Sequence, residues 1–343
     1  MRSLPIRVQR LVNSKAYAAL PLCAVLGAGL DSWFSHRFVQ LCSYRLTSRP
    51  DEHILDYPDS FAYTTFLDAS AVSREAAGSL GPLVDFLHAR FDEGRYSIVM
   101  LDSRRLTGAG PHIREFLFSG SDGNGDLLAT GFDGDARFTA MTFRPDDLND
   151  AFTSGLDAMR TEGQLHLIRS VIQTLRPPDA DEPLSLDRIY AEICRYLACT
   201  PPPGFTVTDG WWWYDRAVDL AATAPVRFGI STHDDVREHL ELAAGGAVPV
   251  DYPMLHLYYE HKRLLLHRQG LLAFGRHLDQ PERAVAGYGR FVDEVNRFRL
   301  GMLMGIAEGR RPTGDDVARF GGFEEREGDL LERFLTLAER GAV

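Results

Sequence analysis

Residues 110–132, GPHIREFLFSGSDGNGDLLATGF, decide the fold of the first half of the chain. Two apolar runs flank the segment SDGNG, which is a hairpin-turn signal because glycine and asparagine tolerate the positive φ values of tight turns. A second turn signal, DGD, leads into a third strand-like run, ARFTAMTF, at residues 136–143. The stretch therefore predicts an antiparallel meander of three strands.

The segments around this meander add a fourth strand and two helices. Residues 79–94, SLGPLVDFLHARFDEG, have helical apolar spacing, and residues 95–103, RYSIVMLDS, resemble a short buried strand. After the meander, residues 144–152, RPDDLNDAF, have the pattern of a capped helix. Helices combined with an antiparallel meander predict an α+β fold class for this half of the chain.

The second half is expected to be mainly α-helical. Residues 157–178 end at two prolines, residues 184–199 are followed by TPPPG, and residues 232–246 end in two glycines. Each of these segments has helical periodicity up to a helix-ending residue, and three more helices are expected after them. We therefore predict an α+β domain over residues 1–155 and a helical domain over residues 156–343, with the proline-rich segment RPPDADEP as a surface connection.

Composition excludes several classes of function. The chain of 343 residues has a formal net charge of −11 and no concentrated basic surface signal, so nucleic-acid binding is not expected. No segment approaches the roughly 20 apolar residues of a membrane helix, so we expect no membrane partner. The four cysteines lack metal-type spacing, which favours reduced thiols and a cytoplasmic location. The sequence is also compatible with a homo-oligomer.

Cys23 is the candidate nucleophile. In ALPLCAVLGAG, Pro21 fits the first helical position, which would place Cys23 near free backbone amides that stabilise a thiolate. His112, at the start of a later strand, would then be the general base. A cysteine on an early helix with a histidine on a later strand is the papain-like arrangement.

Two alternatives to this chemistry remain open. Cys23 also fits the last turn of a helix that begins near Ser14 and continues through Pro21, and it would then face the core. His112 also fits a surface position at the entry of a strand, with no catalytic partner.

Four segments carry a family resemblance: AVLGAGLDSWFSHRFVQLCS, FLHARFDEGRYSIVMLDSRRL, residues 112–152 and LHLYYEHKRLLLHR. They resemble proteins related to the N-terminal domain of butirosin biosynthesis protein H, which are similar in fold to bacteriocin-processing cysteine peptidases. The resemblance implies a papain-like N-terminal lobe and a role in natural-product biosynthesis. It also implies acyl or peptidyl transfer from a carrier-protein thioester by a Cys-His mechanism.

The resemblance also assigns positions in the site, and some of them depart from the family pattern. His112 falls where the family has its histidine. The family's cysteine position, about two turns before AVL, corresponds to Tyr17 or its neighbours, and the partner of the histidine corresponds to Thr130. Tyr17 is therefore assigned to substrate binding, and Thr130 is assigned to the catalytic residues together with Cys23 and His112.

Residues 254–268, MLHLYYEHKRLLLHR, form a second candidate site. His256 and Glu260 share one helix face, while His261 lies on another. Lys262 is one of only two lysines in the chain, so its retention points to a site where an arginine would not fit. We assign His256, Glu260, His261 and Lys262 to a polar seam between the lobes or a contact to a phosphate or carboxylate. The alternative is a solvated face with ion pairs.

No metal or cofactor is expected at this segment or elsewhere. A zinc site needs at least three ligands and supporting hydrogen bonds, and the spacing of His256 and Glu260 supplies two ligands at most.

Residues 209–217, DGWWWYDRA, form an aromatic cluster. Adjacent tryptophans cannot all point into a core, so Trp212 and Trp213 are predicted either to line a groove for an acyl or peptide chain or to plug a domain interface.

Two functions follow from these observations. The first is a cysteine-dependent acyl or peptidyl transferase that uses Cys23 and His112. The second is a catalytically inactive papain-like protein that recognises a carrier domain or a precursor peptide.

Overall fold

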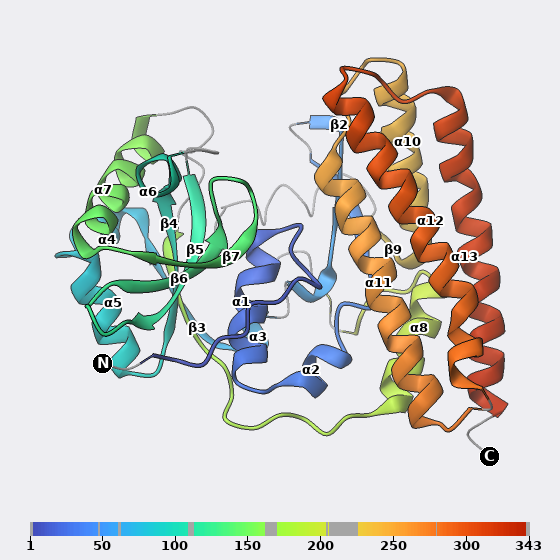
Figure 1. The fold of residues 1–343 in the computed structure, drawn as a ribbon, viewed down its shortest axis with the longest axis horizontal. Coiled ribbons are helices and arrows are strands. Elements are labelled where there is room, and N and C mark those ends of the chain that lie inside the picture. Colours follow the sequence, from blue (N-terminus) through green and yellow to red (C-terminus); the bar gives the residue numbers. More distant parts are fainter. Residues whose placement is uncertain are drawn as a thin grey trace. The chain divides into compact units, whose positions relative to one another are not determined.

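The computed structural model describes residues 3–46, 49–60, 63–108, 113–161, 170–203, 205, 226–278 and 280–340. Within these residues helices and antiparallel sheets are mixed, with most strands in the first half and long helices in the second (Figure 1). The predicted α+β fold class is confirmed.

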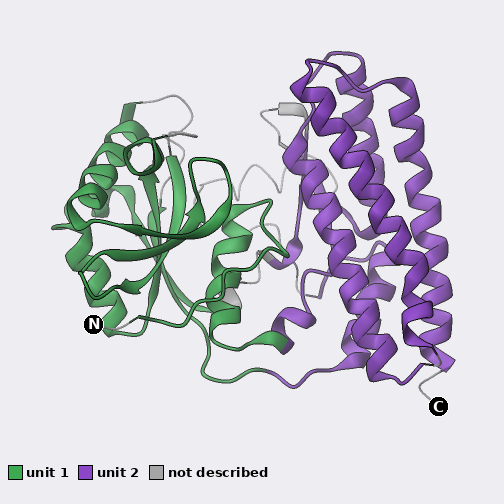
Figure 2. Ribbon diagram, in the orientation of Figure 1, with its two compact units in different colours: residues 1–31, 61–181, 208–218 green, residues 32–60, 182–207, 219–343 purple. Residues whose placement is uncertain are grey.

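The chain divides into two compact units, each made of discontinuous segments (Figure 2). Unit 1 takes its described residues mainly from 1–31 and 61–181, whereas unit 2 takes them from 32–60, 182–207 and 219–343. This division differs from the single boundary predicted after residue 155. Residues 32–60 belong to the helical unit because their strands pair with, and pack on, elements much later in the chain.

Unit 1 is built on a six-stranded antiparallel sheet with the order β3-β8-β4-β5-β6-β7. Its strands are β3 (Asp68–Ser73), β4 (Tyr96–Asp102), β5 (Ile113–Ser121), β6 (Leu127–Phe132), β7 (Phe138–Phe143) and β8 (Ser170–Arg176). The predicted meander is confirmed as β5, β6 and β7. The helix predicted over residues 157–178 is wrong at its end, because β8 inserts as an interior strand between β3 and β4. The run VIQTL within β8 is buried throughout, and its β-branched residues suit that position.

The helices of unit 1 pack on both faces of this sheet. Figure 1 shows α1 on one face, where it contacts β5 and β6, and α5 and α7 on the other, where they contact β4. The helices are α1 (Ala16–Gly27), α3 (Tyr63–Phe66), α4 (Arg74–Ala77), α5 (Leu83–Asp92), α6 (Ser103–Thr107) and α7 (Pro145–Thr161). The chain passes from unit 1 to unit 2 within α2 (Asp31–Ser35). The predicted helices at α5 and α7 are therefore confirmed.

The N-terminal segment crosses α1 closely. A Cβ at Gly27 would lie 2.3 Å from the backbone oxygen of Pro5, so only glycine permits this approach. The amide of Arg7 donates a hydrogen bond to the backbone oxygen of Cys23, at 3.2 Å. The segment thus covers the helix that carries the predicted nucleophile.

Unit 2 combines a small sheet with long helices. Its antiparallel sheet has the order β2-β1-β9 and consists of β1 (Cys42–Leu46), β2 (Arg49–Asp56) and β9 (Arg227–Phe228). Its helices are α8 (Leu186–Leu197), α10 (Thr232–Ala244), α11 (Tyr252–Gly275), α12 (Pro281–Ala307) and α13 (Gly314–Arg340). All five were predicted from the sequence. No helix among the described residues has the length and apolar character needed to span a membrane.

Candidate functional site

Cys23 lies inside α1 and not at its N-terminus. The helix begins at Ala16 and continues through Pro21, so the predicted helix start at Pro21 is wrong and the alternative of an earlier start is confirmed. Cys23 is 0% exposed. Burial raises the pKa of its thiol to about 12, and a contact with the backbone of Gln9 offsets only part of this rise. The thiol is neutral at physiological pH, which removes the property that a nucleophilic cysteine requires.

Of the other residues predicted for the catalytic and substrate sites of this unit, the structure describes Thr130 and Tyr17. His112 lies outside the described residues, as do Trp212 and Trp213. Thr130 is buried in β6, paired with Leu117 of β5 and Ala140 of β7. Tyr17 lies in the first turn of α1 and is partly exposed.

The polar residues of α11 do come together with other groups, inside unit 2. Lys262 and Glu327 of α13 are both 0% exposed, and the ammonium of Lys262 lies 2.8 Å from Oε2 of Glu327. The same ammonium donates a hydrogen bond to the hydroxyl of Tyr196, at 2.7 Å. The predicted solvated face is therefore wrong for Lys262, which is held in an ion pair within the helical core.

Glu327 receives further hydrogen bonds from three helices. Tyr288 of α12 donates to Oε1 at 2.6 Å, and Tyr196 of α8 donates to Oε2 at 3.2 Å. His233 of α10 lies 3.2 Å from Oε2 through Nε2, and the hydroxyl of Tyr258 contacts the same ring nitrogen. We call Tyr196, His233, Tyr258, Lys262, Tyr288 and Glu327, together with His261, the closed network.

The charges of the closed network are set by burial and by the ion pair. Burial alone would raise the pKa of Glu327, but the charge of Lys262 and the contact with His233 outweigh it and hold that pKa below its usual value. Burial lowers the pKa of Lys262, and Glu327 opposes this shift. The pair is thus a carboxylate and an ammonium that stabilise each other in the buried core of unit 2.

His261 connects the closed network to the segment before β1. Its Nε2 lies 2.8 Å from the backbone oxygen of Val39, and its Nδ1 accepts from the ammonium of Lys262 at 3.4 Å. Burial, followed by the charge of Lys262, lowers the pKa of His261 to about 3. The imidazole is therefore neutral, with its proton on Nε2.

His256 and Glu260 lie one turn apart, as predicted, with 3.6 Å between Nε2 and Oε1. Arg299 of α12 donates a hydrogen bond to Nδ1 of His256. Burial and the charge of Arg299 lower the pKa of His256 to about 4, so this histidine is neutral at physiological pH. His256 thus forms a contact between α11 and α12, two helices of the same unit.

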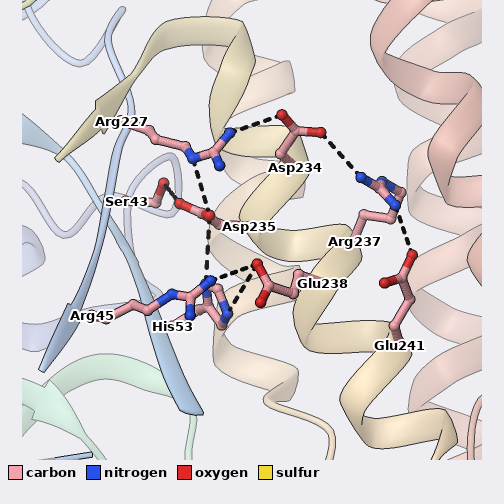
Figure 3. A network of polar contacts seen from close by, with 9 residues as sticks. All are labelled: Ser43, Arg45, His53, Arg227, Asp234, Asp235, Arg237, Glu238 and Glu241. Carbon is pink, nitrogen blue, oxygen red and sulfur yellow. Dashed lines mark hydrogen bonds and ion pairs between the residues drawn. The ribbon is translucent and has the colours of Figure 1, made fainter. Parts of the chain in front are cut away.

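A second cluster, which the sequence analysis missed, lies between the small sheet and α10. Figure 3 shows His53 of β2 near Asp235 and Glu238 of α10, with Arg45 and Arg227 beside the carboxylates. Nδ1 of His53 is 3.6 Å from Asp235, and Nε2 is 3.7 Å from Glu238. We call His53, Asp235 and Glu238, with Ser43, Arg45 and Arg227, the open cluster.

The imidazole of His53 is 1% exposed, and neither ring nitrogen has a hydrogen-bond partner among the described residues. Burial, followed by the charge of Arg45, lowers its pKa. The contacts to both carboxylates are longer than hydrogen bonds. His53 is thus a neutral histidine whose hydrogen-bonding capacity is unused.

The donor set of the open cluster is one that binds divalent cations. His53, Asp235 and Glu238 each bring one ligand atom within 4.8 Å of the others. However, the oxygen of Glu238 that faces His53 also binds Arg45 at 2.6 Å, and the facing oxygen of Asp235 lies 3.3 Å from Arg227. The arginines already neutralise both carboxylates, so a cation would have to displace them.

Sequence signals for these clusters differ in strength. Glu327 lies four residues after Phe323 and four before Leu331, so it falls on the apolar face of its helix, a position where a carboxylate needs a buried partner. That spacing could have identified Glu327 as a buried candidate from the sequence. His53 has no comparable signal, because its partners follow about 180 residues later.

Comparison of the sequence with models of protein families gave no match. A search of curated proteins also gave no significant match.

Proposed function

We propose that this protein is a recognition protein of a natural-product pathway that binds a carrier domain or a precursor peptide in the cytoplasm, without covalent catalysis at Cys23. The partner class comes from the sequence resemblance described above. The observation that favours recognition over acyl transfer is the burial of the Cys23 thiol inside α1, with its pKa raised to about 12.

The other cysteines offer no better nucleophile. Cys42 is fully buried in β1, and burial raises its pKa well above the ordinary value. Burial also raises the pKa of Cys194. Cys199 follows the C-terminal end of α8 and not the N-terminal start of a helix, where a nucleophilic cysteine was predicted.

Thiol labelling of the folded protein tests the catalytic half of the proposal. Iodoacetamide is added at neutral pH, and the adduct at each cysteine is quantified by mass spectrometry. We expect Cys23 and Cys42 to stay unlabelled until urea is added, while the partly exposed Cys194 and Cys199 react first. Faster labelling of Cys23 than of Cys194 would contradict the proposal and favour covalent acyl transfer at Cys23.

Binding measurements test the recognition half. The holo carrier protein and the precursor peptide of the producing pathway are each titrated into the full chain by calorimetry. We expect saturable binding of one of them, unchanged in Cys23→Ala and weakened in Trp212→Ala. Phe274→Ala, at a side chain that is 55% exposed on α11, is the matched aromatic control. Absence of binding by both partners overturns the proposal.

Lys262 is unsuited to this test. The sequence suggested it as a contact residue, but it is paired with Glu327 in the core of unit 2. Substitution there changes stability before it changes any surface.

A further inference from the structure

A pocket of about 200 Å³ lies where α12 ends and α13 begins. Three apolar residues line it: Phe298, which is buried, Met302 and Pro312. Gly301 and Gly305 lie one turn apart on the same face of α12 and also line it. A Cβ built at Gly301 would meet no atom within 4 Å, so this part of the wall is open.

Four arginines and a single carboxylate line this pocket: Arg297, Arg310, Arg311, Arg319 and Asp316. Oδ2 of Asp316 is occupied within its own helix start, because it accepts hydrogen bonds from the amide and the hydroxyl of Thr313 at 2.9 and 2.7 Å. Four positive charges against one negative charge leave an excess of three. This excess occurs on a chain whose formal net charge is −11.

Among the described residues, three of these arginines have no acidic partner. Arg310 pairs with Glu308 at 2.7 Å, but in the part of the chain that the structure describes Arg297, Arg311 and Arg319 form no ion pair. Elsewhere on the same helices arginines do pair, as Arg326 does with Glu294 and Arg333 with Asp329. The pocket thus brings together three guanidinium groups that form no ion pair with a described residue.

Two of the guanidinium groups are held by packing. That of Arg311 lies against Gly246, where an added Cβ would come within 2.2 Å of it. That of Arg319 lies 5.9 Å from the ring centre of Phe298. Such contacts reduce the entropy lost when a guanidinium group binds a ligand.

We infer that this pocket binds a small phosphate ester, with the phosphate on the arginines and a short apolar group against Phe298, Met302 and Pro312. A phosphate monoester carries close to two negative charges and accepts the paired N–H groups of arginine, so it suits a pocket with an excess of positive charge. The inference does not depend on the proposed function.

Titration calorimetry with phenyl phosphate, inorganic phosphate and benzoate tests the inference at physiological ionic strength. We expect phenyl phosphate to bind most tightly, because inorganic phosphate lacks the ring that would contact Phe298, and benzoate carries only one negative charge. Arg311→Gln and Arg319→Gln should each raise its Kd about tenfold, the loss of one charge-assisted hydrogen bond. Arg333→Gln, which removes an equal charge elsewhere on α13, should change it by less than about twofold because salt screens distant charges.

A space-filling variant separates the contribution of the apolar lining from that of the charges. Gly301→Leu should weaken phenyl phosphate more than inorganic phosphate, and the open wall at this position means that the helix accepts the side chain. Absence of phenyl phosphate binding overturns the inference, as does equal weakening by Arg333→Gln and Arg319→Gln. Equal affinity for phenyl phosphate and inorganic phosphate overturns the assignment of an ester.

Discussion

The closed network and the open cluster both depend on α10, and they differ in how their buried polar groups are satisfied. His233 contributes to the closed network, while Asp235, two residues later, points to the opposite side of the helix and contributes to the open cluster. In the closed network the buried carboxylate of Glu327 binds an ammonium and receives hydrogen bonds from Tyr288 and Tyr196. In the open cluster the buried ring of His53 has no hydrogen bond among the described residues.

This difference shows that burial alone does not make a polar group a functional candidate. A buried charge with a complete set of partners is a structural element, whose loss is costly because the remaining partner stays buried without compensation. A buried group whose hydrogen-bonding capacity is unused makes fewer specific contacts. Changing such a cluster should therefore lower the free energy of unfolding by less. The predictions that follow test this contrast, from the largest expected effect to the smallest.

Breaking the closed network should have the largest effect on stability. Glu327→Leu leaves the ammonium of Lys262 buried without a counter-charge, and we expect the free energy of unfolding to fall by about 3–5 kcal/mol. Urea denaturation followed by circular dichroism measures the loss. The double variant Lys262→Met/Glu327→Leu should regain much of it, because no charge then stays buried. A double variant less stable than Glu327→Leu would show that the ion pair is not the main contribution.

The closed network should also govern part of the pH dependence of stability. The pKa of His261 is about 3 in the folded protein and about 6.5 when unfolded, so between these values only the unfolded chain binds the proton. Stability therefore falls as pH falls through about 6.5, and this histidine alone accounts for about 2 kcal/mol at pH 5.

The variant His261→Gln isolates this contribution. We expect it to lose less stability than the wild type between pH 7 and pH 5, as measured by urea denaturation at both values. Parallel losses in the two proteins would mean that His261 is protonated in the folded state.

The open cluster should tolerate change better. Asp235→Asn removes the charge that pairs with Arg227 but keeps an oxygen that accepts from Ser43. We expect a loss of about 1.5 kcal/mol, the lower end for a hydrogen bond to a charged group. The midpoint of urea unfolding measures it. A loss as large as that of Glu327→Leu would remove the distinction between the two clusters.

The outer edge of the open cluster should contribute least to the free energy of unfolding. Arg45 and Glu238 form an ion pair whose side chains are 37% and 40% exposed, and water screens their attraction. We expect Arg45→Gln to change the unfolding free energy by about 0.5 kcal/mol or less, with the difference vanishing at high salt. Thermal melts at low and high salt check both statements, and a loss that persists at high salt would contradict the second.

Local sequence patterns predicted much of the fold. The meander β5 to β7 was recognisable because its turns carry glycine and aspartate, and the helices from α10 onward because apolar residues recur at helical spacing. β8 was missed because a run as short as VIQTL fits a buried helix as well as a buried strand. Its identity is decided by β3 and β4, which pair with it on both sides.

The candidate sites were less predictable than the fold. Lys262 was noticed because lysine is rare in this chain, yet its environment could not be deduced from α11 alone. Cys23 was assigned by local logic to a helix start, but α1 continues through Pro21 and the N-terminal segment covers it. The pKa of a thiol depends on its exposure to solvent and on its neighbours in space. Neither can be read from the position of the cysteine in the sequence.

The sequence by itself determined the α+β class, the meander and the order of the helices, since turn chemistry and apolar periodicity act between residues close in the chain. Only the tertiary structure decided that Lys262 meets Glu327, that His53 lies between Asp235 and Glu238, and that Cys23 is sealed from solvent. These outcomes depend on desolvation and on contacts between segments up to about 200 residues apart. Such contacts exist only once the chain has packed.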